Sequence, residues 1–168
     1  MREAFGLLAA VLLTGCAAGA EEFRPAGTPP AAPVASPAAD DRRGSVLAAY
    51  REFQRVFESA LATNDPGEIA SVAGPPVAGN LIAQVERQGR EGVVRRSHSA
   101  LNPRIVRIRR GRAEVLDCVT ASGFSTYDAG TGRRLPARPV RERGLLHATL
   151  RDHGGWKVVG LELLERRC

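Results

Sequence analysis

The spacing of apolar residues changes near Gly92, and this change constrains the fold more than any other feature of the sequence. Before it, apolar side chains recur every three or four residues, as on one face of a helix. After it, they alternate with polar side chains, as in a half-buried strand. Helices followed by a run of strands are typical of an α+β fold, in which helices pack on an antiparallel sheet. We therefore expect an α+β domain.

Three helices are expected before the change of period. Ser45 can cap the first, which runs to about Thr63. Its apolar face would consist of Val46, Tyr50, Phe53, Phe57, Ala60 and Leu61. Pro66 suits the first turn of a short second helix that reaches about residue 73, and the Gly-Pro-Pro that follows ends it. The third helix is expected from about Val77 to Gln88.

Six strands are expected in the remainder of the chain. They cover Val93–Leu101, Arg104–Arg109, Ala113–Thr120, Phe124–Tyr127, Gly144–Arg151 and Trp156–Leu164. Turns are expected at Arg110-Gly111 and at residues 128–132, and residues 133–143 read as irregular. The last two strands form a hairpin across residues 152–155.

The N-terminus reads as a signal for export. Arg2 precedes an apolar stretch from Gly6 to Leu13, which is too short to span a bilayer but suits a secretory signal. Leu13-Thr14-Gly15-Cys16 resembles the lipobox of bacterial lipoproteins. That resemblance implies that residues 1–15 are removed and that Cys16 carries a diacylglycerol and an acyl chain such as palmitate. The alternative is an ordinary secretory signal, cut after Ala18 or Ala20.

Residues 16–42 follow as a tether, because Pro, Ala, Gly and Ser dominate them and cannot build a core. Residues 43–168 are then left as a single domain. A lipid on Cys16 places this domain on the outer face of the cytoplasmic membrane. The membrane, reached through the lipid anchor, is thus the first expected partner.

Cys118 and Cys168 are the two cysteines that remain once Cys16 is assigned to the lipid. In an oxidising compartment such thiols pair, so we expect a disulfide with Cα atoms about 4.4–6.8 Å apart. It would close a loop that stabilises the domain by about 4 kcal/mol in the chain-entropy account. The alternative is two free thiols. A catalytic cysteine is less well supported, because nothing beside Cys118 would stabilise a thiolate.

Several stretches resemble a known family. They are Asp117-Cys118, residues 127–132 (YDAGTG), residues 155–158 (GWKV) and the terminal Cys168. These stretches, with helices ahead of an antiparallel meander, resemble the nuclear transport factor two-like fold of SnoaL-type cyclases and ketosteroid isomerases. More specifically they resemble uncharacterised actinobacterial secreted lipoproteins. The resemblance implies a cone-shaped, cystatin-like domain with a pocket between the first helix and a curved sheet, and it implies no activity.

A pocket of this kind would take its apolar wall from Tyr50, Phe53 and Phe57, with Asp117 or His147 as the polar group. The alternatives are that Tyr50 belongs to the core and that Asp117 caps a segment or pairs with an arginine. No stretch carries a catalytic signature, so we expect no enzyme activity and no cofactor. His147 and His153 have no cysteine or carboxylate at metal-ligand spacing, so no metal site is expected.

A basic patch is expected on one hairpin. It consists of Arg104, Arg107, Arg109, Arg110 and Arg112. The chain has 24 basic and 18 acidic residues, and Lys157 is its one lysine. No aromatic residues lie between these arginines to stack on bases, so nucleic acid is not an expected partner. The patch is either a solvated sheet edge or a surface for anionic lipid or an acidic partner.

Three functions follow from these features. The first is a lipid-anchored, non-enzymatic binding or assembly domain at the cell envelope, with an envelope protein as partner. The second is a small-ligand-binding or cryptic isomerase or cyclase-type domain that uses the pocket. The third is a surface protein whose basic face contacts anionic wall polymers.

Overall fold

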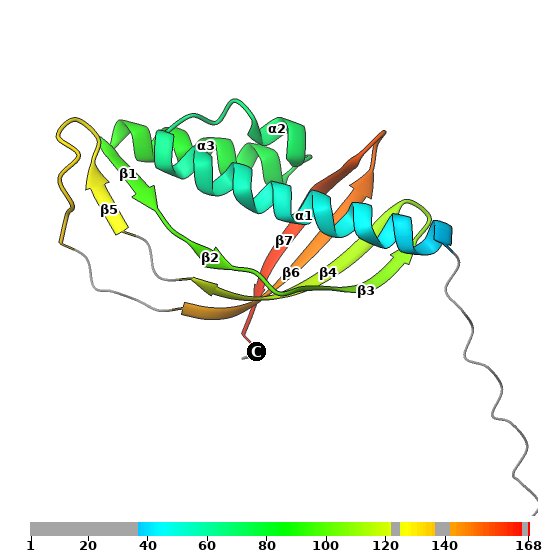
Figure 1. Ribbon diagram of the computed structural model, residues 1–168. Helices are drawn as coiled ribbons and strands as arrows, with labels where there is room; N and C mark the ends of the chain where they lie inside the picture. The colour runs from blue at the N-terminus through cyan, green and yellow to red at the C-terminus, as the bar shows by residue number, and fades with distance from the viewer. Residues whose placement is uncertain (1–36, 122–124, 137–141, 166–167) are drawn as a thin grey trace, which may run out of the picture. The chain divides into compact units, whose positions relative to one another are not determined.

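A computed structural model describes residues 37–121, 125–136, 142–165 and 168 (Figure 1). It contains three helices, α1 (Pro37–Thr63), α2 (Ile69–Val72) and α3 (Val77–Arg90). The strands follow in the order β1 (Val93–Arg96), β2 (Ser99–Ala100), β3 (Pro103–Arg109), β4 (Arg112–Ala121), β5 (Ser125–Asp128), β6 (Glu142–Asp152) and β7 (Trp156–Leu164). The expected signal peptide, Cys16, most of the expected tether and Phe124 lie outside the described residues.

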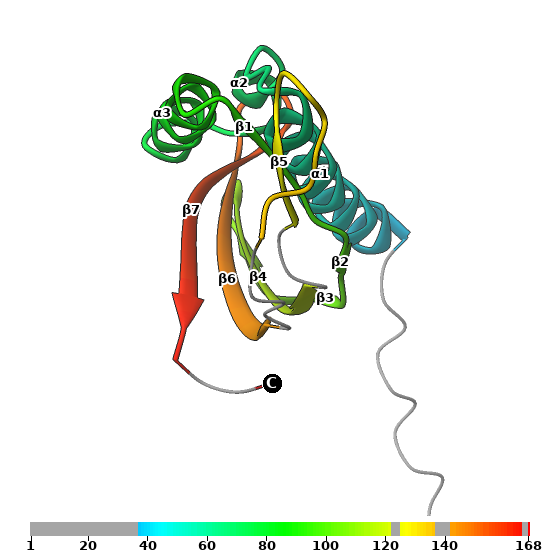
Figure 2. The ribbon, with the colours of Figure 1, turned by 90° about the vertical axis from the view of Figure 1, so that its left-hand side faces the viewer.

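The strands form two antiparallel sheets. In the larger sheet the order is β2-β4-β6-β7, and β3 pairs with the same edge of β4 as β2 does. The ladder between β4 and β6 is its longest, from Arg112 opposite Arg151 to Ala121 opposite Glu142. A separate two-stranded sheet pairs β1 with β5. Figures 1 and 2 show the larger sheet as a curved layer with the helices gathered against it.

The core lies between one face of the larger sheet and the helices. Alternate residues of the strands are fully buried there: Ala113, Val115, Ala148, Leu150 and Val158. The helices contribute Val46, Tyr50, Phe53, Leu61, Ile69 and Val85. Burial of this apolar area is the main favourable contribution to folding. The expected α+β class, with helices on a curved antiparallel sheet, is confirmed.

The first helix begins earlier than expected. It starts at Pro37, so residues 37–42 belong to α1 rather than to the tether. Ser45 lies inside the helix, where its Oγ donates a hydrogen bond to the carbonyl of Arg42 (2.9 Å) instead of capping the N-terminus. Asp40 in the first turn is favourable there, because a carboxylate complements the helix dipole. The second helix, in contrast, is shorter than expected, since it begins only at Ile69.

The single strand expected over Val93–Leu101 is also wrong, because the chain divides it between the two sheets. β1 pairs with β5, whereas β2 pairs with β4. Glu58 of α1 accepts hydrogen bonds from the N–H of Ser99, the first residue of β2 (3.0 Å), and from Oγ of Ser97, which lies between the two strands (3.5 Å). These contacts tie the chain to α1 at the point where the two strands separate.

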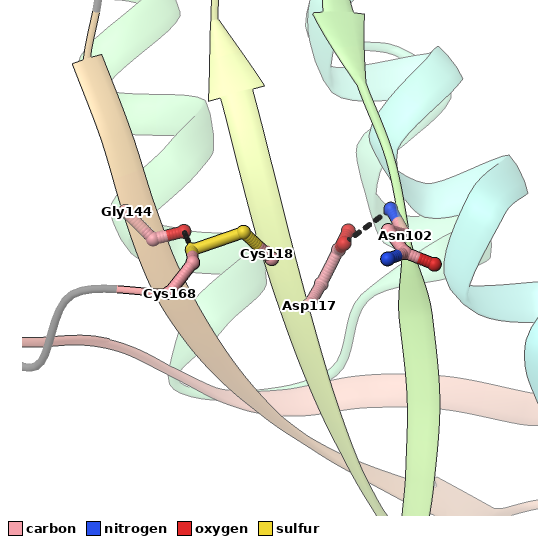
Figure 3. Close-up of a disulfide and its surroundings, with 5 residues drawn as sticks. All are labelled: Asn102, Asp117, Cys118, Gly144 and Cys168. Atoms are coloured by element: carbon pink, nitrogen blue, oxygen red, sulfur yellow. Dashed lines mark hydrogen bonds between the residues drawn. A yellow bond between two sulfur atoms is a disulfide. The ribbon is translucent and has the colours of Figure 1, made fainter.

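The expected disulfide joins Cys118 of β4 to Cys168, with Cα atoms 5.6 Å apart (Figure 3). Cys118 pairs in register with Leu145, on the sheet face that points away from the helices. The Cys168 sulfur lies 3.4 Å from the carbonyl oxygen of Gly144. The bridge therefore fixes the C-terminal residue across the β4–β6 ladder.

We predict that replacing both cysteines (C118S/C168S) lowers the free energy of unfolding by about 2–5 kcal/mol, because the unfolded chain regains the entropy that the cross-link removes. Urea denaturation followed by circular dichroism measures this. Reduced wild-type protein should match the double variant, which controls for the serine substitutions. A double variant as stable as the oxidised protein would contradict the prediction.

Candidate functional site

Tyr50 and Phe53, two of the residues expected to line a pocket, are fully buried in the core. Phe57 is half-buried beside them, with its ring centroid 6.4 Å from that of Phe53. None of the three lines the groove described below. Their helical spacing is equally typical of residues that face a hydrophobic core. The burial of Tyr50 agrees with the alternative that this residue belongs to the core.

Asp117 is fully buried and is held by Tyr50. The Tyr50 hydroxyl donates to Asp117 Oδ2 (3.0 Å), and Gln54 Nε2 donates to the same hydroxyl (3.0 Å). Asp117 Oδ1 accepts from the backbone N–H of Asn102 (2.6 Å; Figure 3). Burial and the neighbouring Asp117 carboxylate raise the pKa of Tyr50 well above its ordinary value, so the phenol keeps its proton. Asp117 thus accepts from a backbone N–H, as a capping carboxylate does, and the described residues show no ion pair between Asp117 and an arginine.

His147 lies on the other face of the sheet. Its register partners are Leu116 on β4 and Glu162 on β7, whereas Asp117 pairs with Leu146. Since neighbouring residues of a strand point to opposite faces, His147 and Asp117 do not share a site. The expectation of one pocket with either residue as its polar group is therefore corrected: Asp117 belongs to the core and His147 to the opposite face.

The expected basic patch lies on the β3–β4 hairpin, and all five arginines are exposed. Arg110 and Gly111 both have positive φ (46° and 71°), as a tight two-residue hairpin turn requires, which confirms the expected turn. Arg104 is opposite Leu116 and Arg107 is opposite Glu114. Val106, at a bulge between them, is 58% exposed.

A groove of about 860 Å³ lies elsewhere, between the α2–α3 connection and the ends of β4, β6 and β7. Sequence reasoning did not predict it. It is lined by Ala70, Ala73, Gly74, Pro75, Ala78, Arg112, Thr149, Arg151, His153, Lys157, Val159 and Gly160. The connection runs along the edge of β7, where the Gly74 N–H donates to the Val158 carbonyl (2.8 Å). One wall is therefore mostly apolar and the other is basic.

The basic wall is part of a row of four cations, which we call the cationic row: Arg109, Arg112, Arg151 and Lys157. The strand register places Arg109 opposite Arg112, Arg112 opposite Arg151, and Arg151 opposite Lys157. Four adjacent strands thus each contribute one cation at the same level, on the face away from the core. Arg109 and Arg112 belong to the expected basic patch, so the sequence identified half of this row.

Among the described residues, Lys157 and Arg112 of the cationic row have hydrogen-bond partners. Lys157 Nζ donates to the carbonyl of Ala70 in α2 (2.8 Å), which holds the ammonium at the groove. Arg112 lies 3.5 Å from a Glu114 oxygen and 3.5 Å from Thr149 Oγ1. Glu114 does not line the groove, and the described residues that do line it include no acidic side chain. The groove therefore presents more positive than negative charge.

Two negative findings concern the described part of the chain alone. Within residues 37–121, 125–136, 142–165 and 168, no group of three or more His, Cys, Asp or Glu side chains is arranged to hold a metal ion. No helix in the same ranges combines the length and the apolar character that crossing a membrane requires.

No protein-family model matches this chain, and no curated protein matches it. Among solved structures, it is similar to the intermembrane space region of the chloroplast protein ARC6, with a TM-score of 0.58 and 11% identity, over 73% of this chain and 95% of that chain. An uncharacterised protein with a cystatin-like fold from Caulobacter vibrioides has a TM-score of 0.44 and 14% identity, over 71% and 90% of the two chains. At this identity the ARC6 similarity shows a shared α+β fold and nothing of function.

We predict that Tyr50→Phe destabilises the protein at neutral pH by about 1–3 kcal/mol, because Asp117 Oδ2 and Gln54 Nε2 lose a buried partner. The difference in free energy of unfolding between wild type and Tyr50→Phe should shrink above pH 10. There the unfolded chain releases the Tyr50 proton and the folded chain keeps it, so wild-type stability falls by about 1.4 kcal/mol per pH unit relative to the variant.

Urea denaturation at several pH values from 7 to 11.5 tests this. Tyr127→Phe is the matched control, since it removes a hydroxyl from a half-buried tyrosine, and it should cost less at neutral pH. A difference between wild type and Tyr50→Phe that stays constant across this pH range would contradict the prediction.

Proposed function

We propose that the chain is a lipid-anchored lipoprotein on the outer face of the cytoplasmic membrane and that its domain binds a ligand or partner without catalysis. The observation that carries the binding function is the groove, with its apolar wall and its basic wall. Pockets that mix an apolar lining with a few placed polar groups are typical of ligand sites.

The location rests on the lipobox-like Leu13-Thr14-Gly15-Cys16 and gains support from the disulfide. Disulfides persist in oxidising compartments outside the cytoplasm and are rare within it. A tether after Cys16 would let the domain reach partners at the membrane surface. We further propose that the domain belongs to the nuclear transport factor two-like group, on the support of its helices and curved antiparallel sheet.

Binding is better supported than isomerase or cyclase chemistry. The buried carboxylate, Asp117, already accepts hydrogen bonds on both oxygens and lies in the core. The groove contains His153 but no carboxylate to pair with it. A pairing of a histidine with a carboxylate at one site would favour acid–base chemistry, and the described residues show that pairing neither at the groove nor in the core.

We predict that Cys16→Ser abolishes lipid attachment. In a bacterium that processes lipoproteins, the wild-type protein should incorporate labelled palmitate and enter the detergent phase after phase separation. Two acyl chains suffice for stable membrane attachment. The variant should incorporate no palmitate.

Cys168→Ser is the matched control, because it removes a different cysteine and should leave labelling intact. Equal palmitate labelling of wild type and Cys16→Ser would exclude Cys16 as the lipidated residue, and absence of label from both would exclude the lipoprotein proposal.

A further inference from the structure

We propose that the groove binds the phosphate group of a small amphipathic ligand, with Arg112, Arg151 and Lys157 of the cationic row holding the phosphate and the apolar wall holding the attached apolar group. This inference rests on the proposed binding function and adds the ligand class. It does not depend on the lipid anchor.

The first argument is the electrostatic cost of the cationic row. Residues directly opposite each other on neighbouring strands have Cβ atoms about 4.5–5.5 Å apart, and like charges in such pairs are destabilising. Arg109, Arg112, Arg151 and Lys157 make three such pairs in succession. The Arg112–Glu114 contact is the one ion pair that the described residues show in the row, and both side chains are solvent-accessible, so it compensates little. A bound anion would relieve this repulsion.

The second argument concerns the type of anion. Arginine guanidinium groups present paired donors that match phosphate oxygens, and lysine binds phosphate as a point charge. Arg112, Arg151 and Lys157 line the same groove from three adjacent strands. The Lys157 ammonium uses one donor on the Ala70 carbonyl and retains two. Three adjacent cations suit a dianionic phosphate better than a single carboxylate.

The third argument concerns the apolar wall. Ala70, Ala73, Pro75, Ala78 and Val159 form it together with Gly74 and Gly160, and Thr149 and His153 are the remaining polar residues of the lining. A Cβ atom at Gly160 would lie 3.2 Å from Cβ of Thr149, and one at Gly74 would lie 3.0 Å from Val159 Cγ1. The two glycines therefore allow the α2–α3 connection and β6 to pack closely against β7, where a larger side chain would collide with Val159 or Thr149. A short apolar group attached to the phosphate would cover this wall and add affinity.

Trp156 provides the measurement, because it is the one tryptophan in the chain and immediately precedes Lys157. The full chain, purified in dodecyl maltoside, is titrated with hexyl phosphate while its tryptophan fluorescence is recorded. We expect saturable binding that Arg151→Gln weakens about tenfold or more, which corresponds to the loss of one charge-assisted hydrogen bond. Binding unaffected by Arg151→Gln would overturn the proposal.

Arg104→Gln is the matched control. It makes the same change of charge on the same sheet face, but Arg104 lies opposite Leu116 and outside the groove. It should leave hexyl phosphate binding unchanged within about twofold, given the weak interaction of exposed charges at a distance. Equal weakening by Arg104→Gln and Arg151→Gln would show a general charge effect and overturn the groove as the site.

The probes distinguish the sources of the phosphate. Tighter binding of hexyl phosphate than of inorganic phosphate supports the amphipathic ligand, and equal binding overturns the role of the apolar wall. Dihexanoylphosphatidylglycerol tests a lipid headgroup, and if it binds more tightly than hexyl phosphate, the ligand is a lipid. Hexylphosphocholine carries a cation that compensates the negative charge of its phosphate, so it should bind more weakly than hexyl phosphate. If hexylphosphocholine binds as tightly as hexyl phosphate, the proposal is overturned.

A stability measurement separates a ligand site from a structural role. If the cationic row serves ligand binding and not folding, Arg151→Gln should raise the midpoint of thermal unfolding at low salt by about 1–3 °C. The reason is that the substitution removes the charge repulsion between Arg151 and its neighbours Arg112 and Lys157. A lower midpoint would show that Arg151 stabilises the fold and would overturn the argument from repulsion. If hexyl phosphate does not bind, the palmitate labelling of Cys16 is still an independent test, and the proposed lipid anchor is unaffected.

Discussion

The two-residue alternation of β4 is the constraint on which most of this structure depends. Its odd-numbered residues, Ala113, Val115 and Asp117, face the helices and are fully buried. Its even-numbered residues include Arg112, which lines the groove, and Cys118, which forms the disulfide. A shift of register by one residue would exchange the two faces, placing an arginine in the core and removing both features at once.

The hydrogen bond between Tyr50 and Asp117 helps to fix that register. A buried carboxylate is tolerated only where partners satisfy it, and here the partners come from α1 and from the backbone of Asn102. The Tyr50 hydroxyl reaches Asp117 across the core, and Gln54, one turn further along α1, donates to the same hydroxyl. The interior thus gains specificity from a polar network that apolar packing alone would not provide.

The sequence was sufficient to predict the elements whose formation depends on nearby residues. It was insufficient to predict features that form where distant segments meet. The third helix, the β6–β7 hairpin and the Arg110-Gly111 turn follow from nearby residues, and all were predicted nearly in place. The break between β1 and β2 reflects their pairing with different strands, β5 and β4, and the pairing of Arg112 with Arg151 depends on which strands become neighbours. Neither can be derived from periodicity. The groove was missed for this reason.

The cationic row shows how a local conflict can identify a site. Local preferences, packing and charge agree over most of a natural sequence, and departures from that agreement are expected at functional positions. In the core of this domain they do agree: small and branched side chains pack on the helices, and the buried carboxylate is satisfied. At one end of the same sheet four strands each bring a cation to the same level. Stability alone gives no reason for this arrangement, since alternating charges there would strengthen the sheet. Because the row borders a groove with an apolar wall, the repulsion is best understood as the cost of an anion site.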